Sequence, residues 1–151
     1  IAQKALTQLK TTGVVFAAWG LEPGFVSVLS LRDKSTVNKV ASKARQSLSW
    51  ASLAPSLFRE TLLMPTLGME EEQAEREGIL SFGKSAVEAV TYVLGGQSQV
   101  VFMPRAVSMD AFREVANQGE RLPPKSTYFY PKLATGLVFR LLKGELARPG
   151  L

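Results

Sequence analysis

The segment GILSFGKS (78–85) has the spacing of a nucleotide-binding loop. Two glycines flank four residues ahead of Lys84 and Ser85. In P-loop proteins this spacing turns backbone N–H groups toward phosphate, while the lysine and the hydroxyl residue serve the phosphates and the metal ion. Nucleotide binding is therefore the first hypothesis that the sequence raises.

The residues around this pattern argue against a phosphate cradle. A P-loop follows a buried strand, whereas the preceding stretch 70–77 is the most charged in the chain. Three of the four intervening residues are large and apolar: Ile79, Leu80 and Phe82. We therefore expect 79–82 to be a short strand whose apolar side chains pack inward. The turn from this strand into a helix leaves a weak alternative phosphate site, which consists of Gly83, Lys84 and Ser85.

The loop RLPPKSTYFYPKLA (121–134) is a second candidate site. Residues 123–132 contain three prolines, two lysines, two hydroxyl residues and three aromatic residues. Prolines stiffen the loop, so its polar side chains could hold a phosphate or a carboxylate in a fixed arrangement. The candidate anion contacts are Lys125, Ser126, Thr127, Tyr128, Tyr130 and Lys132. The alternative is a loop that folds over a sheet edge and buries its rings.

The composition excludes several classes of chemistry. The 151 residues include no cysteine and no histidine, so disulfides, thiol catalysis, Ser-His-Asp machinery and zinc sites built on these residues are ruled out. An oxygen-only Mg²⁺ or Ca²⁺ site is left open by the composition, but we assign no metal site, and the cofactor is unknown. The absence of cysteine fits a reducing cytoplasm. No stretch of the sequence is apolar for long enough to predict a membrane span.

The charge distribution gives little support to nucleic-acid binding. The net charge is +5, although 70–77 carries five acids against one base. A basic surface can attract phosphate, but the lysines and arginines are spread along the chain without the aromatic interleaving of single-strand binders. We interpret them as a solvated surface.

Hydrophobic patterns predict five strands. GVVFAAWG (13–20) is apolar on both faces, which indicates an interior strand. A turn at Pro23-Gly24 connects it to a partner strand at 25–31, which makes an antiparallel hairpin. The remaining strands are expected at 79–82, 99–103 and 135–142.

Helices are predicted between these strands. The expected ranges are 1–10, 50–63, 85–94 and 108–118. The acidic stretch 70–77 is expected to be a short solvated helix or a linker, and the polar stretch 32–47 a loop that is partly helical. Pro55 fits the first turn of its helix, where its missing N–H is harmless. Ser85 and Ser108 have the positions of N-caps. The order predicts an α+β fold with a mixed five-stranded sheet, in which an antiparallel hairpin joins a parallel β-α-β unit, packed with three to four helices.

At this length we expect a single domain, 1–151.

The segment PPKSTYFYPKLATGLVF (123–139) resembles the C-terminal signature of a conserved microbial family catalogued as domain of unknown function 1015. The segments LLMPTLGM (62–69), SFGKSAVEAV (81–90) and VVFMPRAVSM (100–109) follow the order of the same family. The resemblance implies a C-terminal domain of a two-part protein whose first part carries an Asp-Gly-His-His-Arg type motif. That family has no established activity.

We therefore expect a non-catalytic C-terminal domain of a cytoplasmic protein. Its loop 123–132 would contact a phosphate-bearing or anionic small ligand, or the missing N-terminal domain of the same protein. One alternative is a phosphoryl-transfer enzyme or nucleotide-binding domain that uses Lys84 or Lys125 with Glu60 or Asp110. A second alternative is a protein–protein interaction module that uses the aromatic residues 128–130.

Overall fold

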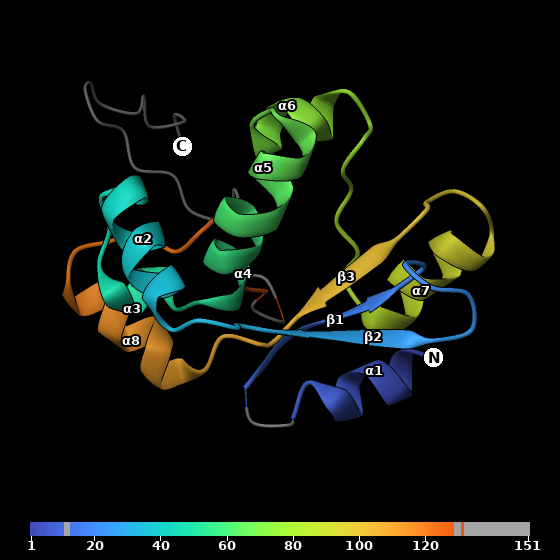
Figure 1. Cartoon of the computed structure of the whole chain (residues 1–151), viewed down its shortest axis with the longest axis horizontal. Coiled ribbons are helices and arrows are strands. Elements are labelled where there is room, and N and C mark those ends of the chain that lie inside the picture. Colours follow the sequence, from blue (N-terminus) through green and yellow to red (C-terminus); the bar gives the residue numbers. More distant parts are fainter. Residues whose placement is uncertain (11–12, 129–130, 132–151) are drawn as a thin grey trace, which may run out of the picture.

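A three-stranded antiparallel sheet organises the described part of the chain (Figure 1). The structure is a computed structural model that describes residues 1–10, 13–128 and 131. The strand order is β2-β1-β3, with β1 at Val14–Trp19, β2 at Val26–Ser30 and β3 at Val101–Pro104. The central strand pairs with both neighbours at Ala17, which lies opposite Val28 in β2 and Met103 in β3. The class is therefore α+β, as predicted.

The predicted sheet of five strands with a parallel unit is wrong. The third strand is antiparallel to β1, and residues 79–82 form no strand. Without a strand before α7, the β-α-β unit does not exist. The strand expected at 135–142 lies outside the described residues.

The antiparallel hairpin is confirmed. Gly24 has a positive φ of 82° in the turn between β1 and β2, and the N–H of Phe25 closes the turn on the carbonyl of Glu22 at 3.2 Å. Gly20, at the end of β1, has a φ of 101°, and a Cβ there would lie 2.3 Å from the carbonyl oxygen of Gln99. Only glycine permits this approach between the end of β1 and the start of β3.

Nine helical segments surround the sheet in the described residues. Their bounds are α1 Ala2–Gln8, α2 Ser35–Ala44, α3 Leu48–Ala51, α4 Ala54–Leu57, the π-helix η1 Phe58–Leu63, α5 Met64–Leu67, α6 Glu71–Arg76, α7 Ala86–Leu94 and α8 Met109–Asn117. Helices α2, α3 and α8 gather at one end of the sheet, while α1 lies beneath it (Figure 1). Within the described residues, no helix combines the length and the apolarity needed to cross a bilayer.

The two faces of β1 belong to two cores. Phe16 packs with α2, α3, α4 and α8 around Trp50, Leu57 and Val115. Ala17 points to the opposite face, where it packs with α1, α7 and Met103. A strand that is covered on both faces must be apolar at every position, which is why the interior position of this strand could be predicted.

The stretch 32–47 forms more helix than we expected. Its helix α2 buries Val40 and Ala41 in the core. The predicted helix 50–63 is divided into shorter helical segments. Pro55 lies in the first turn of α4, as expected. The π-helix η1 then leads into α5, which contains Pro65. A proline inside a helix clashes with the carbonyl four residues earlier, and a wider turn before Pro65 relieves that clash.

Candidate anion-binding pocket

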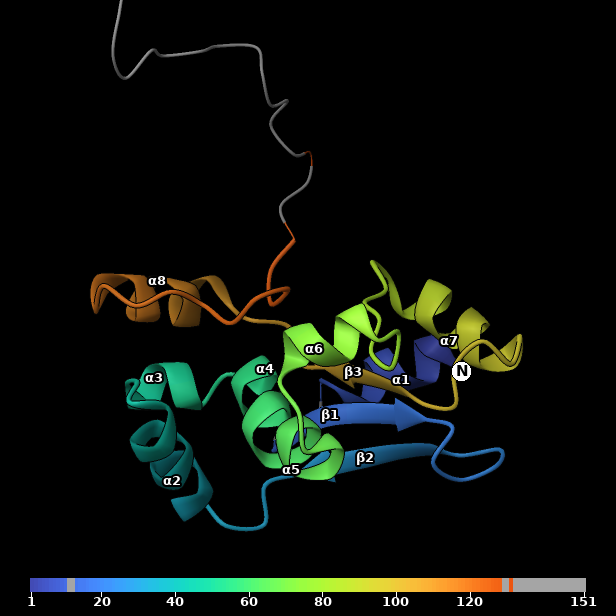
Figure 2. The same cartoon turned by 90° about the horizontal axis from the view of Figure 1, so that it is seen from above.

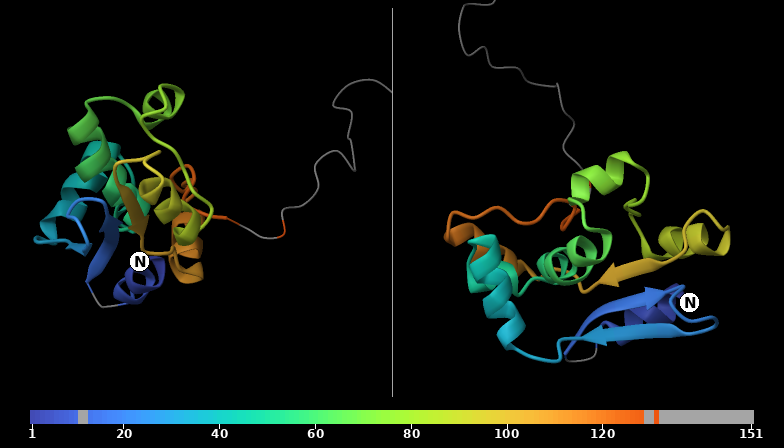
Figure 3. Two further views of the ribbon diagram at one scale, coloured as in Figure 1. Left: turned by 90° about the vertical axis from the view of Figure 1, so that its right-hand side faces the viewer. Right: turned by 45° about the horizontal axis from the view of Figure 1, so that its top comes forward.

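A cavity of about 370 Å³ lies along the outer edge of β3. Every residue from 100 to 106 lines it, and its walls come from both sides of the sheet. Leu6 of α1 and Tyr92 of α7 stand on one side, and Phe58 and Leu63 of η1 on the other. In the described part of the chain β3 is an edge strand; Figure 3 shows it beside α7 and the coil that leads into α7. We call this cavity the edge pocket.

The edge pocket brings together the two segments that the sequence singled out. Gly83, Lys84 and Ser85 line it, and so do Lys125 and Ser126 from the proline-rich loop. These segments are some forty positions apart in the sequence. Of the other candidates, Thr127 and Tyr128 are exposed and do not line the cavity, while Tyr130 and Lys132 lie outside the described residues.

The segment 78–85 does not form a phosphate cradle. The N–H groups of Ile79 and Leu80 both donate to the carbonyl of Ala74, at 2.9 and 3.1 Å. The expectation that the apolar side chains pack inward in a strand is wrong, because Ile79 is 53% exposed and Phe82 is 41% exposed. Backbone donors committed to Ala74 cannot turn toward a triphosphate without breaking these bonds.

The N-terminus of α7 is capped by its own side chains. The Ser85 hydroxyl accepts a hydrogen bond from the N–H of Glu88 (3.1 Å), as the predicted cap requires. The carboxylate of Glu88 accepts in turn from the N–H of Lys84 at 2.9 Å. A carboxylate thus occupies the position where a helix N-terminus would attract an anion. The Lys84 side chain is exposed and has no ion-pair partner among the described residues.

Two anchors hold the start of the proline-rich loop. The indole N–H of Trp50 donates to the carbonyl of Arg121 at 3.1 Å, and the carboxylate of Glu120 accepts from the N–H of Ser47 at 2.6 Å. Figure 2 shows the segment after α8, in orange, running back along α8 toward α6. These contacts tie the start of the loop, at Glu120 and Arg121, to α3 and its N-cap.

Lys125 stands at a sharp turn with an unusual backbone. The N–H of Ser126 donates to the carbonyl of Pro123 at 3.3 Å, and Lys125 has a φ of 57°. Positive φ at the third position of such a turn normally requires glycine or asparagine. The ammonium group of Lys125 pairs with Glu75 at 2.9 Å and lies 5.2 Å from the centre of the Phe82 ring. Residues in strained backbone regions are concentrated at functional sites.

Ser126 places a hydroxyl group on the wall of the edge pocket. Its Oγ is buried and has no hydrogen-bond partner among the described residues. An unsatisfied buried hydroxyl costs about 1–3 kcal/mol.

Glu71 is a pocket residue that the sequence did not single out. It lines the edge pocket together with a second cavity of about 310 Å³, whose wall also includes Lys125 and Arg59. Partial burial raises the pKa of the Glu71 carboxyl above its ordinary value of 4.5, an effect that Arg59 partly offsets. In the sequence Glu71 is one of several glutamates in 70–77, and only the packing of α6 distinguishes it from them.

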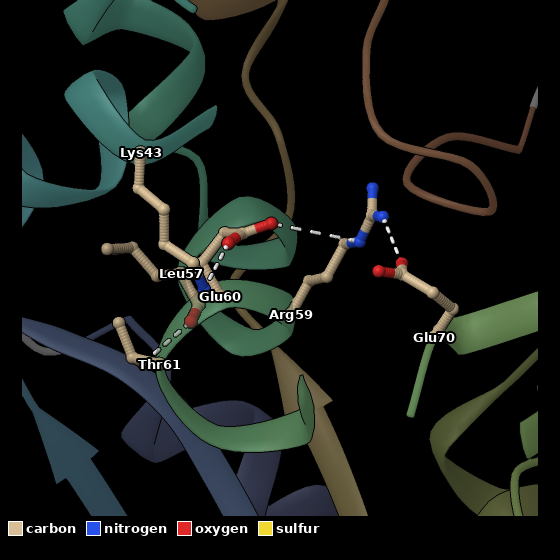
Figure 4. A network of polar contacts seen from close by, with 6 residues as sticks. All are labelled: Lys43, Leu57, Arg59, Glu60, Thr61 and Glu70. Carbon is tan, nitrogen blue, oxygen red and sulfur yellow. Dashed lines mark hydrogen bonds and ion pairs between the residues drawn. The ribbon is translucent and has the colours of Figure 1, made fainter. Parts of the chain in front are cut away.

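A chain of ion pairs borders the second cavity (Figure 4). Glu60 of the π-helix, whose side chain is only 7% exposed, pairs with Lys43 at 3.1 Å and with the Nε of Arg59 at 3.8 Å. The same arginine pairs with Glu70 through Nη2 at 2.9 Å. Glu60 is therefore engaged in a structural network and lines neither cavity. The other proposed base, Asp110, is exposed on α8 and pairs with Arg113 at 3.5 Å.

The acidic side chains do not converge on a metal. Among residues 1–10, 13–128 and 131, no group of three or more acidic side chains is placed to hold a metal ion. The polar side chains that line the edge pocket carry positive charges or hydroxyl groups, apart from a single carboxylate. This arrangement has the charge and the donor groups that bind an anion.

Comparison with known proteins found no match: neither a family model, nor a curated protein sequence, nor a solved structure matches the chain. The resemblance to domain of unknown function 1015 therefore stays a prediction, which is carried by the residues quoted above.

Proposed function

We propose that the chain is a non-catalytic domain that binds a phosphate-bearing or anionic small molecule in the edge pocket. The supporting observation is that two segments with anion-binding composition line one cavity, although they are distant in the sequence. Lys84, Lys125 and Arg105 all line the pocket and supply positive charge. Ser126 belongs to the wall beside Lys125.

The lysines have different roles in this proposal. Lys84 is solvated and can turn toward a ligand at little cost. Lys125 is already paired with Glu75 and stacked near Phe82, so it is pre-oriented and its rotamers are restricted. Pre-orientation favours binding because less side-chain entropy is lost when the ligand arrives.

The resemblance to domain of unknown function 1015 extends the proposal to the whole protein. On that basis the chain is the C-terminal domain of a longer cytoplasmic protein, and the missing N-terminal domain is a further partner for the loop 123–132. The ligand in the edge pocket would then lie where the two parts meet. A second candidate is a protein-interaction module, which is favoured by the 55% exposure of Tyr128.

Titration with inorganic phosphate tests the proposal. Backbone NMR signals of residues 83–85 and 125–126 should shift with phosphate at millimolar concentration. Lys84→Ala and Lys125→Ala should each weaken binding several-fold, because each removes one charge that faces the cavity. Lys39→Ala is the matched control, since this exposed lysine on α2 lines neither cavity.

The same titration with nucleotides and phosphoamino acids covers the rest of the ligand class. Unchanged spectra across the whole panel would refute the proposal. An equal loss of affinity in Lys39→Ala would show that binding reflects the net charge of the domain and has no defined site.

A further inference from the structure

We infer that the ligand of the edge pocket is amphipathic, with an apolar alkyl or aryl body that carries one phosphate or carboxylate group. This inference rests on the proposed function and adds the body of the ligand to its charged head. It follows from the residues that form the pocket walls around the two lysines.

Most of the wall is apolar, and part of it is open to solvent. Leu6 of α1 is 43% exposed and Phe82 of the coil before α7 is 41% exposed, yet both line the cavity. Leu80 and Met103 add further apolar surface. These side chains come from separate elements and converge on the edge of β3. A ligand made only of a charged head would leave this surface in water, whereas an apolar body would bury it.

The charged and apolar parts of the pocket adjoin each other. The Nζ of Lys125 lies 5.2 Å from the centre of the Phe82 ring, so a head group that reaches the ammonium ion places its body against that ring. Ser126, which also lines the cavity, follows Lys125 directly. The geometry therefore suits a molecule whose charge sits at the end of an apolar chain.

Glu71 limits the charge of the head group. Glu71 lines the same cavity as Lys84 and Lys125, and like charges in a partly desolvated site repel one another. A nucleoside triphosphate would bring several negative charges against this carboxylate. A single phosphate monoester or carboxylate keeps the balance of charge in the pocket favourable.

The test compares three ligands with the intact chain by NMR or calorimetric titration: inorganic phosphate, octyl phosphate and octanol. Octyl phosphate should bind at least about tenfold more tightly than inorganic phosphate, because burying about two methylene groups is sufficient for that factor. Octanol should bind more weakly than octyl phosphate, since it lacks the charge that Lys84 and Lys125 attract.

Two wall variants identify the apolar contacts. Leu6→Gln and Leu80→Gln should each reduce the affinity for octyl phosphate several-fold and leave the affinity for inorganic phosphate unchanged. Leu48→Gln is the matched control, because Leu48 is an exposed helical leucine outside the cavity. Circular dichroism of each variant shows that it is folded before its affinity is compared.

The outcomes separate this inference from the proposed function. Equal affinity for inorganic phosphate and octyl phosphate would overturn the amphipathic ligand and leave the anion site standing. No binding of either anion would overturn both. Octanol that binds as well as octyl phosphate would overturn the role of the charged head. Binding to phosphatidylglycerol vesicles without binding of octyl phosphate would show a membrane surface as the partner and overturn the inference.

Discussion

The carboxylate of Glu88 accepts a hydrogen bond from the backbone N–H of Lys84 at 2.9 Å. This contact joins the lysine of the segment with the P-loop spacing, 78–85, to a carboxylate in the helix that follows it. The chain places its own carboxylate at the N-terminus of α7, where a P-loop would hold phosphate. The lysine of the motif can then attract an anion only through its side chain.

Glu88→Gln should increase the affinity for inorganic phosphate several-fold. The amide keeps an oxygen that can accept from the N–H of Lys84, while the negative charge beside this pocket residue is removed. The helix should lose about 0.3–1 kcal/mol of stability, because a negative charge near a helix N-terminus is stabilising. Phosphate titration and urea unfolding measure the two effects. Unchanged phosphate affinity would indicate that the anion binds away from α7.

Lys125→Gly should be more stable than Lys125→Ala by about 1 kcal/mol. Both substitutions remove the contacts with Glu75 and Phe82, but only glycine relaxes the positive φ. Neither variant should bind phosphate as the parent chain does. Urea unfolding and phosphate titration of the pair separate backbone strain from ligand binding. Equal stability of the two variants would show that the turn is not strained at this position.

Glu71→Gln should make the domain more stable at neutral pH. Because burial raises the pKa of Glu71 above 4.5, the folded chain binds this proton more tightly than the unfolded chain does. The protonated Glu71 carboxyl therefore adds to the free energy of unfolding. This contribution is complete below pH 4.5 and is lost as the pH rises through the raised native pKa. The variant, which cannot ionise here, should match the parent at low pH and exceed it above that window. Urea unfolding at a series of pH values checks this, and a difference independent of pH would contradict it.

Glu60→Ala and Glu70→Ala should lower the stability of the domain by different amounts, although both acids pair with Arg59. Glu60 is nearly buried and Glu70 is 62% exposed. Removing Glu60 should cost about 1–3 kcal/mol, since its contact with Lys43 at 3.1 Å is made by a charged carboxylate that is only 7% exposed. Removing Glu70 should cost less than about 1 kcal/mol, as for other exposed pairs. Thermal unfolding compares the two, and equal losses would contradict a structural role for the buried pair.

Local signals made some elements predictable from the sequence. The Pro23-Gly24 turn lies between two apolar runs, and Ser85 and Ser108 each cap the helix that begins after them. Each of these features depends on interactions between residues a few positions apart. They are therefore visible without knowledge of the fold.

Elements whose state depends on distant partners could not be predicted in the same way. The run 79–82 has strand composition but is not paired in the sheet, although β3 is an edge strand in the described part of the chain. The N–H groups of Ile79 and Leu80 instead donate to the carbonyl of Ala74 in α6. The helix α2 had a signal that we missed. Val37, Val40, Ala41 and Ala44 recur at helical spacing, and all four contribute to the core.

The candidate site was predictable in its parts but not in its assembly. The compositions of 83–85 and 123–132 each suggested an anion, yet nothing in either stretch indicates that both reach the edge of β3. Glu71 and Phe82 joined the site only through the packing of α6 and the following coil. A cavity between elements that are distant in sequence depends on tertiary contacts, which periodicity does not encode.

During synthesis of the chain, the two partner strands of β1 become available at different times. The hairpin can close as soon as β2 has left the ribosome, because its strands are joined by a short turn. The second partner of β1 is complete only after Pro104 has been added. Until then the far edge of β1 at Ala17 and Ala18 remains open to pairing with other strands. A nascent chain that stalls between Ser30 and Val101 would therefore expose an unpaired β-edge and be prone to aggregation.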